Sequence, residues 1–201
     1  MENEFVVPGL AEALRWEVPP ASWKAGDAAL VAAAGPQTDL FIDPAGSAPK
    51  LTAPRLLAAA PAGDFTLSAR VSVDFAADFD AGVLMLYAAD DTWAKLCFEY
   101  SPQGEAMVVS VVTRGVSDDA NAFVVDGGQV WLRISRTGTG YAFHASEDGQ
   151  LWQFIRQFAL PTTAPLRIGF APQSPTGEGC TVSFDEIRFA PAGVADLRSG
   201  E

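Results

Sequence analysis

Short hydrophobic runs that alternate with polar residues dominate the chain. They are rich in Val, Phe, Tyr, Trp and Thr and are separated by Gly, Pro, Asp and Asn, and no stretch keeps a helical period for three turns. This pattern predicts an all-β protein with enough strands for two packed sheets. The expected strands cover residues 14–18, 28–33, 38–42, 54–60, 65–75, 82–89, 92–100, 106–114, 122–126, 129–137, 140–146, 151–158, 166–171 and 180–190.

Turn-forming residues recur at close spacing in the middle of the chain. Because Gly, Asn and Asp supply the backbone angles that tight hairpins need, closely spaced turns predict an antiparallel meander. The expected turns are "AADDTW" (88–93), "SPQGEA" (101–106), "DGGQ" (126–129), "RTGTG" (136–140) and "SEDGQL" (146–151).

The size and composition fit one domain. The chain has 201 residues, of which 49% are hydrophobic and 19% charged, so it can form a substantial core. We expect a single β-sandwich domain over residues 1–190, followed by a flexible tail, "PAGVADLRSGE", at 191–201.

The negative net charge argues against polyanionic partners. The formal charge is −12 and the pI about 4.4, whereas nucleic acids and anionic membranes are bound by Lys and Arg clusters. We therefore expect neither partner. The N-terminal "MENEFVVPGL" is acidic where a secretory signal is basic, and no apolar run reaches the roughly 18 residues of a membrane span. This predicts a cytoplasmic protein, in which Cys97 and Cys180 are two buried thiols rather than a disulfide.

Strand parity indicates where a site could lie. In "TWAKLCFEY" (92–100) the alternation puts Trp93, Lys95, Cys97 and Glu99 opposite a set of core residues. The same reading of "QVWLRISR" and "GYAFHASEDG" turns Arg133 and His144 outward from their strands. If these strands share a sheet, they present aromatic, cationic and acidic groups on one concave face. Such a face suits a sugar, whose C–H faces stack on rings while its hydroxyls need hydrogen-bond partners.

Each of these residues also has a purely structural interpretation. Trp93 can brace the sandwich, and Lys95 with Glu99 can be an ordinary surface pair worth about 0–1 kcal/mol. His144 is the only histidine, which excludes a site with several His ligands. Asp118 and Asp119 suit a turn cap better than a Ca²⁺ site. No metal and no cofactor are expected.

The sequence lacks the spaced motifs that mark most enzyme classes. The sequence has no GxSxG elbow, and the Gly-containing stretch "GVSDDANAF" leads into another strand rather than a helix. Glycoside hydrolysis needs only two carboxyl groups beside a sugar cleft. Asp185 and Glu186 are adjacent and face opposite ways, and Lys95 should keep Glu99 ionised rather than protonated.

Several motifs in order resemble a known family. They are "FDAGVLMLYAADDTWAKLCFEYSPQG" (79–104), "VVSVVTRGVSDDANAF" (108–123), "VWLRISRTGTGYAFHASEDGQLW" (130–152), "IRQFAL" (155–160) and "GFAPQSPTGEGCTVSFDEI" (169–187). The succession resembles the regulation-of-enolase-type family, a group without an assigned activity in the concanavalin A-like lectin/glucanase superfamily. The resemblance covers residues 14–189 and implies a jelly-roll sandwich of two antiparallel sheets, one of them concave.

The resemblance also implies a set of site residues. By analogy with related sandwiches, these polar and aromatic side chains should converge on the concave face, with the "TRGVSDD" turn as one lip and Arg114 aimed inward. The predicted ligand-binding residues are Trp93, Lys95, Glu99, Arg114, Ser117, Asp118, His144, Arg156, Gln173 and Ser174.

Three functions remain open at this point. The leading one is a module that binds a carbohydrate or sugar derivative, with Trp93 stacking on the ligand. The second is a glycoside hydrolase that uses Glu99 with His144 or Asp118. The third is a metabolic regulator that acts through protein contacts. The sequence leaves the oligomeric state open, a homodimer included.

Overall fold

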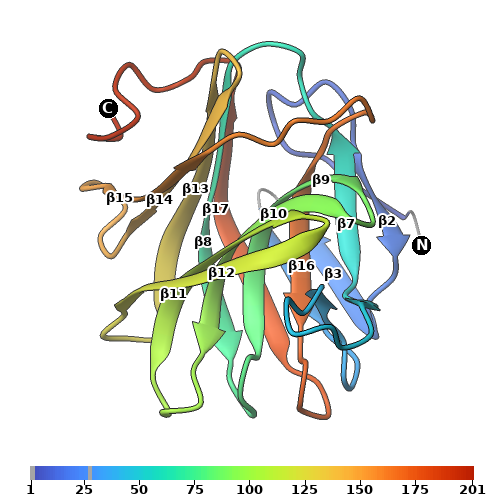
Figure 1. Cartoon of the computed structure of the whole chain (residues 1–201). Coiled ribbons are helices and arrows are strands. Elements are labelled where there is room, and N and C mark those ends of the chain that lie inside the picture. The colour runs from blue at the N-terminus through green and yellow to red at the C-terminus, as the bar shows by residue number, and fades with distance from the viewer. Residues whose placement is uncertain (1–2, 27–28) are drawn as a thin grey trace.

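Two antiparallel sheets packed face to face form the molecule (Figure 1). The computed structural model describes residues 3–26 and 29–201. The expected all-β sandwich is confirmed. Within the described residues, no helix is long and apolar enough to cross a membrane.

The first sheet has eight strands, of which the middle ones carry the candidate site. Its consecutive strands β9 to β12 form an antiparallel meander, whereas the turn at 126–129, expected to be a hairpin, carries the chain into the second sheet. In spatial order the sheet comprises β1 (Glu4–Phe5), β2 (Leu14–Val18), β7 (Arg55–Ala59), β16 (Arg167–Gln173), β9 (Ala81–Ala89), β10 (Thr92–Tyr100), β11 (Ala106–Arg114) and β12 (Val116–Val124).

The second sheet has seven strands, and a separate two-stranded ribbon lies outside both sheets. The second sheet comprises β15 (Gln153–Phe158), β14 (Gly140–Ser146), β13 (Gln129–Thr137), β8 (Phe65–Asp74), β17 (Thr181–Ala190), β4 (Ala29–Ala33) and β3 (Ser22–Gly26), and the ribbon comprises β5 (Leu40–Phe41) and β6 (Lys50–Leu51).

The main core lies between the sheets and follows the predicted parity. Leu96 and Phe98 of β10 face Leu132 and Ile134 of β13 across the sandwich interior. Every second residue on these strands is buried there, so the intervening residues face outward. Cys97 and Cys180 are both buried free thiols, as predicted.

Some strand boundaries differ from the expectation. β12 begins at Val116, not at residue 122, so the "TRGVSDD" turn is a tight hairpin whose flanking residues belong to β11 and β12. The chain reverses at Gly115, whose φ of 82° suits glycine. β1, β3 and β6 were not predicted, and residue 28 of the expected strand 28–33 lies outside the described residues.

The C-terminal segment contacts the second sheet. Leu197 and Gly200 offer backbone carbonyls to the side chains of His144 and Arg133, at 2.7 and 2.6 Å. Figure 1 places this end of the chain beside β13–β15. The segment 191–201, which we expected to be a flexible tail, therefore contacts the outer face of that sheet at Leu197 and Gly200.

Candidate functional site

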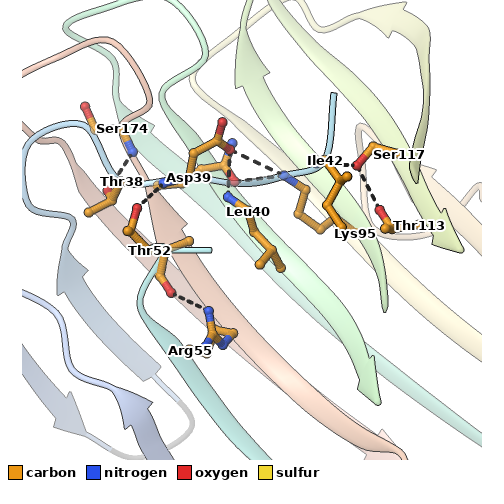
Figure 2. A network of polar contacts seen from close by, with 12 residues as sticks. Thr38, Asp39, Leu40, Ile42, Thr52, Arg55, Lys95, Thr113, Ser117 and Ser174 are labelled. Carbon is orange, nitrogen blue, oxygen red and sulfur yellow. Dashed lines mark hydrogen bonds and ion pairs between the residues drawn. The ribbon is translucent and has the colours of Figure 1, made fainter. Parts of the chain in front are cut away.

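A strap formed by residues 38–53 crosses the outer, concave face of the first sheet. At one end Thr38 pairs with Ser174, which follows β16, through backbone bonds of 3.0 and 3.1 Å. At the other end Ile42 and Ser117 of β12 exchange two bonds of 2.9 Å, one from the Ser117 backbone and one to its hydroxyl. Figure 2 shows the strap running between these two anchors. It spans the strands β16, β9, β10, β11 and β12.

Beneath the strap lies a second apolar cluster. Leu40 of the strap is 1% exposed and belongs to the same cluster as Met85, Trp93 and Val109 of the sheet. Most of the hollow that the sheet curvature creates is therefore filled by protein. The strap leaves one part of the face open.

The open part is a pocket of about 290 Å³, at the lower end of the range for small-molecule sites. Its floor comes from β10, β11, β12 and the end of β16, and its walls come from the strap and from two loops. The lining residues are Asp39, Phe41, Lys50, Phe79, Lys95, Glu99, Val111, Asp119, Gln173, Pro175 and Thr176.

Lys95 is the buried cation of the pocket. Its Nζ donates to Gln173 Oε1 at 3.1 Å and lies 3.9 Å from Asp39 Oδ1. It also lies 5.4 Å from the centroid of the Trp93 ring beneath it. Asp39 is itself fixed, because its Oδ1 accepts the Leu40 amide at 2.7 Å. These contacts hold Lys95 in one orientation with its charge balanced.

Two carboxyl groups in the pocket have raised pKa values. Burial raises the pKa of Glu99 to about 8, and the nearby charges of Asp119 and Asp39 add to this, while Lys95 opposes it. Burial likewise raises the pKa of Asp119, against the effect of Lys95. The expectation that Lys95 keeps Glu99 ionised is therefore wrong, because loss of solvation outweighs the attraction of one ammonium group. At neutral pH Glu99 is mostly protonated and can donate a hydrogen bond.

Phe79 forms an aromatic wall at the pocket mouth. Its φ is 69°, a backbone conformation that is costly for a bulky residue and persists only where the surroundings enforce it. Asp80 provides that support: its side chain accepts the amides of Ala76 and Ala77 at 2.9 Å each and the Ser174 hydroxyl at 2.6 Å. The Phe79 amide also bonds to Tyr100 O at 2.7 Å. The backbone that carries the ring is thus fixed before any ligand arrives.

Three of the predicted site residues, Lys95, Glu99 and Gln173, line this pocket together. Their role in binding a ligand stays a prediction. Trp93 points to the same side of the sheet but is fully buried under the strap. It cannot stack on a ligand, so that expectation is wrong.

Two other predicted residues anchor the strap instead of facing a ligand. Ser117 bonds to Ile42 and to the Thr113 hydroxyl, the latter at 2.9 Å. Ser174 bonds to Thr38 and Asp80. Both are buried. They shape the pocket from outside it.

Asp118 and Arg156 join the edges of the two sheets. Arg156 of β15 bonds to the Asp118 carboxylate at 3.0 Å and to its carbonyl at 3.2 Å. Asp118 and Asp119 face opposite sides of β12, so they cannot share a Ca²⁺ ion. Arg114 is exposed at the β11–β12 turn and lies on the side of β11 opposite to Thr113. The prediction that it points into the hollow is therefore wrong.

His144 lies on the other side of the sandwich. It belongs to β14 in the second sheet, and its Nε2 bonds to Leu197 O under the C-terminal segment. Burial lowers its pKa to about 4. The parity prediction for β13 and β14 is correct, but the assumption that they share a sheet with β10 is wrong. His144 therefore cannot act with Glu99.

Eight of the eleven lining residues were missing from the predicted site. Asp119 could have been found from alternation, had the strand over 116–124 been recognised. Val111 lies on β11, where alternation also gives its outward direction. The other six come from loops or from the short ribbon β5–β6, where no periodicity indicates direction, namely Asp39, Phe41, Lys50, Phe79, Pro175 and Thr176.

Solved structures share this architecture. A functionally unknown protein from Saccharomyces cerevisiae is 24% identical, with a TM-score of 0.82 over 90% of this chain and 97% of that chain. A GH43 protein from Bacillus licheniformis is 14% identical with a TM-score of 0.69, over 86% of this chain but only 35% of that chain. An alginate lyase from Klebsiella pneumoniae is 16% identical with a TM-score of 0.54, over 86% and 84% of the two chains. At these identities the similarity shows a common β-sandwich fold.

The sequence matches one family model over most of its length. No curated protein matches it. The implied connection with enolase regulation is not shown by any of these matches and stays a prediction. The family match covers residues 16–192, so the chain belongs to the DUF1349 family of proteins of unknown function.

Proposed function

We propose that the protein binds a small polyhydroxylated ligand, of the size of one monosaccharide, in the pocket beside the strap. The observation that carries the proposal is the combination of aromatic walls with a ring of hydrogen-bonding groups in one small cavity. Phe41 and Phe79 offer ring surfaces, while Lys95, Glu99 and Asp119 offer donors and acceptors. Sugars need both kinds of contact.

The dimensions and charge of the pocket favour one neutral sugar unit. The strap fills the rest of the concave face, so a long polysaccharide cannot lie along it. The charge of Lys95 is balanced by Asp39, and Glu99 is mostly neutral at pH 7. The other two charged residues that line the pocket, Lys50 and Asp119, are exposed, so a neutral ligand meets no buried unpaired charge.

The experiment is a calorimetric titration with a panel of neutral pentoses, neutral hexoses and uronic acids at pH 7. We expect saturable binding of at least one neutral sugar, with affinity about tenfold weaker in Phe79→Ala because a stacked ring is removed. Arg114→Gln is the matched control, because Arg114 is exposed outside the pocket. Absence of binding by the whole panel, or equal affinity in Phe79→Ala, contradicts the proposal.

A second candidate function is hydrolysis of a glycoside. The raised pKa of Glu99 favours it, because a carboxyl group protonated at neutral pH can donate a proton to a leaving group. In that case Glu99→Gln retains sugar binding but loses turnover of aryl glycosides. Sugar binding with no turnover by the unmodified protein supports the binding function alone.

A further inference from the structure

A second hollow, of about 550 Å³, lies on the outer face of the second sheet, on the opposite side of the sandwich from the pocket. Ser68 and Thr66 of β8 form its floor. Two arginines and an indole ring form much of its walls, and the residues concerned are Arg133, Trp152 and Arg188.

Strand register places the two arginines on either side of a hydroxyl group. Arg133 of β13 and Arg188 of β17 are both paired with Ser68 on the strand between them. Neighbouring strands lie about 4.8 Å apart, so the two arginine Cα atoms are about 10 Å apart across a short side chain. Two long guanidinium side chains can therefore reach the same point above Ser68.

The charge of Arg133 is not balanced by a carboxylate. Among the ion pairs of residues 3–26 and 29–201, none involves Arg133, and its buried Nε has no partner there. The guanidinium lies 4.1 Å from the centroid of the Trp152 ring, and its Nη2 donates to the Gly200 carbonyl. The stacking fixes the cation, and neither partner neutralises it.

Arg188 is the more exposed member of the pair. Its side chain is 77% exposed, and its only ion pair in the described part of the chain is a 3.7 Å contact with Glu186. Glu186 also pairs with Arg70, at 3.1 Å. Arg188 can therefore turn from Glu186 toward a ligand at small cost.

We propose that this hollow is an anion site, which holds the carboxylate or phosphate group of a small molecule between Arg133 and Arg188. The guanidinium groups donate N–H bonds to its oxygens, and the Ser68 hydroxyl donates a third from below. Guanidinium matches the geometry of both groups. Because the protein carries a charge of −12, long-range repulsion keeps the affinity modest.

The test is a nuclear magnetic resonance titration of the ¹⁵N-labelled protein with inorganic phosphate and, separately, with acetate, at one ionic strength maintained with sodium chloride. We expect saturable shifts of the Ser68 amide and the Trp152 indole N–H for at least one of the two anions. Saturation by phosphate alone supports a phosphate ester as ligand, and saturation by acetate alone supports a carboxylate. No saturable shift with either anion overturns the proposal.

Two variants connect the shifts to the arginines. Arg133→Gln and Arg188→Gln should each weaken anion affinity about tenfold, because each removes a charge-assisted hydrogen bond. Arg188→Gln leaves the Gly200 contact in place, so it remains informative if Arg133→Gln loosens the C-terminal segment. Arg114→Gln, on the other sheet, serves as the control.

Wild-type anion affinity in both Arg133→Gln and Arg188→Gln overturns the proposal. The sugar pocket is not involved, so the two functions are tested separately.

Discussion

The two outer faces of the sandwich have the same alternating sequence pattern, but they differ in the chemical environment of their charged side chains. On both sheets every second residue faces away from the core, and both faces carry charged side chains at these positions. On the first sheet the strap adds buried leucine and carboxylates, so Lys95 meets Asp39. On the second sheet the C-terminal segment adds mainly backbone carbonyls, so Arg133 keeps its charge unpaired. The covering segment, more than the strand, decides what each face can bind.

The largest expected effect comes from breaking the strap. Leu40→Ala removes a fully buried side chain from the cluster beneath it, and such changes cost about 2–5 kcal/mol. We expect a loss of about 3 kcal/mol in the free energy of unfolding, measured with urea, together with loss of sugar binding. Leu151→Ala is the control, because Leu151 is 77% exposed and its loss should cost under about 0.5 kcal/mol. If the two variants were equally stable, the strap would not be integral to the fold.

The fold followed from the sequence because alternation and turn chemistry are local signals. β9, β10, β11, β13 and β14 were predicted within one or two residues, and so were the hairpin turns at 88–93, 101–106 and 136–140. The hairpin expected at 126–129 was wrong, because that turn joins the two sheets. Each of these strands has a continuous apolar face, so the pattern has one interpretation.

The site was only partly predictable, because it depends on which strands share a sheet. Parity correctly turned Glu99 and His144 away from the core, but the sandwich has two outer faces and the sequence does not say which strand belongs to which. Phe79 was missed because its position follows from a strained loop held by Asp80. Trp93 was misassigned because the strap that covers it is distant in sequence.

An intermediate effect should follow from the titration of Glu99. Its pKa is about 8 in the folded protein and 4.5 in the unfolded chain, so between these values the folded state binds more protons and stability falls as pH rises. Relative to wild type, Glu99→Gln should therefore gain roughly 2 kcal/mol between pH 6 and pH 8. Urea unfolding across this range measures the difference.

The control for the pH series is Glu105→Gln, because Glu105 is exposed and lies in the turn after β10. It should follow the wild-type curve. A wild-type pH dependence in Glu99→Gln would mean that Glu99 is ionised in the folded protein, and the donor role proposed for it in sugar binding would fail.

The smallest expected effect comes from a substitution in the C-terminal segment, which covers the outer face of the second sheet. Gly200 has a φ of +79°, and a Cβ there would lie 2.6 Å from Arg133 Nη2 and 3.1 Å from both His144 Cδ2 and Trp152 Cβ. Gly200→Ala should cost about 1 kcal/mol, because the side chain is strained at this φ and the contact must open. Gly63→Ala, where a Cβ meets nothing within 4 Å, is the control.

The informative readout for Gly200→Ala is local, because the C-terminal segment contributes little to the core. We expect faster amide hydrogen exchange at residues 197–200 and unchanged exchange in β13. Loosening the segment also releases Arg133 Nη2 from the Gly200 carbonyl, so phosphate or acetate should bind more tightly than to the wild type. This outcome is the reverse of Leu40→Ala, where loosening the cover abolishes binding. If Gly200→Ala instead weakened anion binding, the C-terminal segment would be part of the anion site rather than a competitor for Arg133, and the contrast between the two faces would not hold.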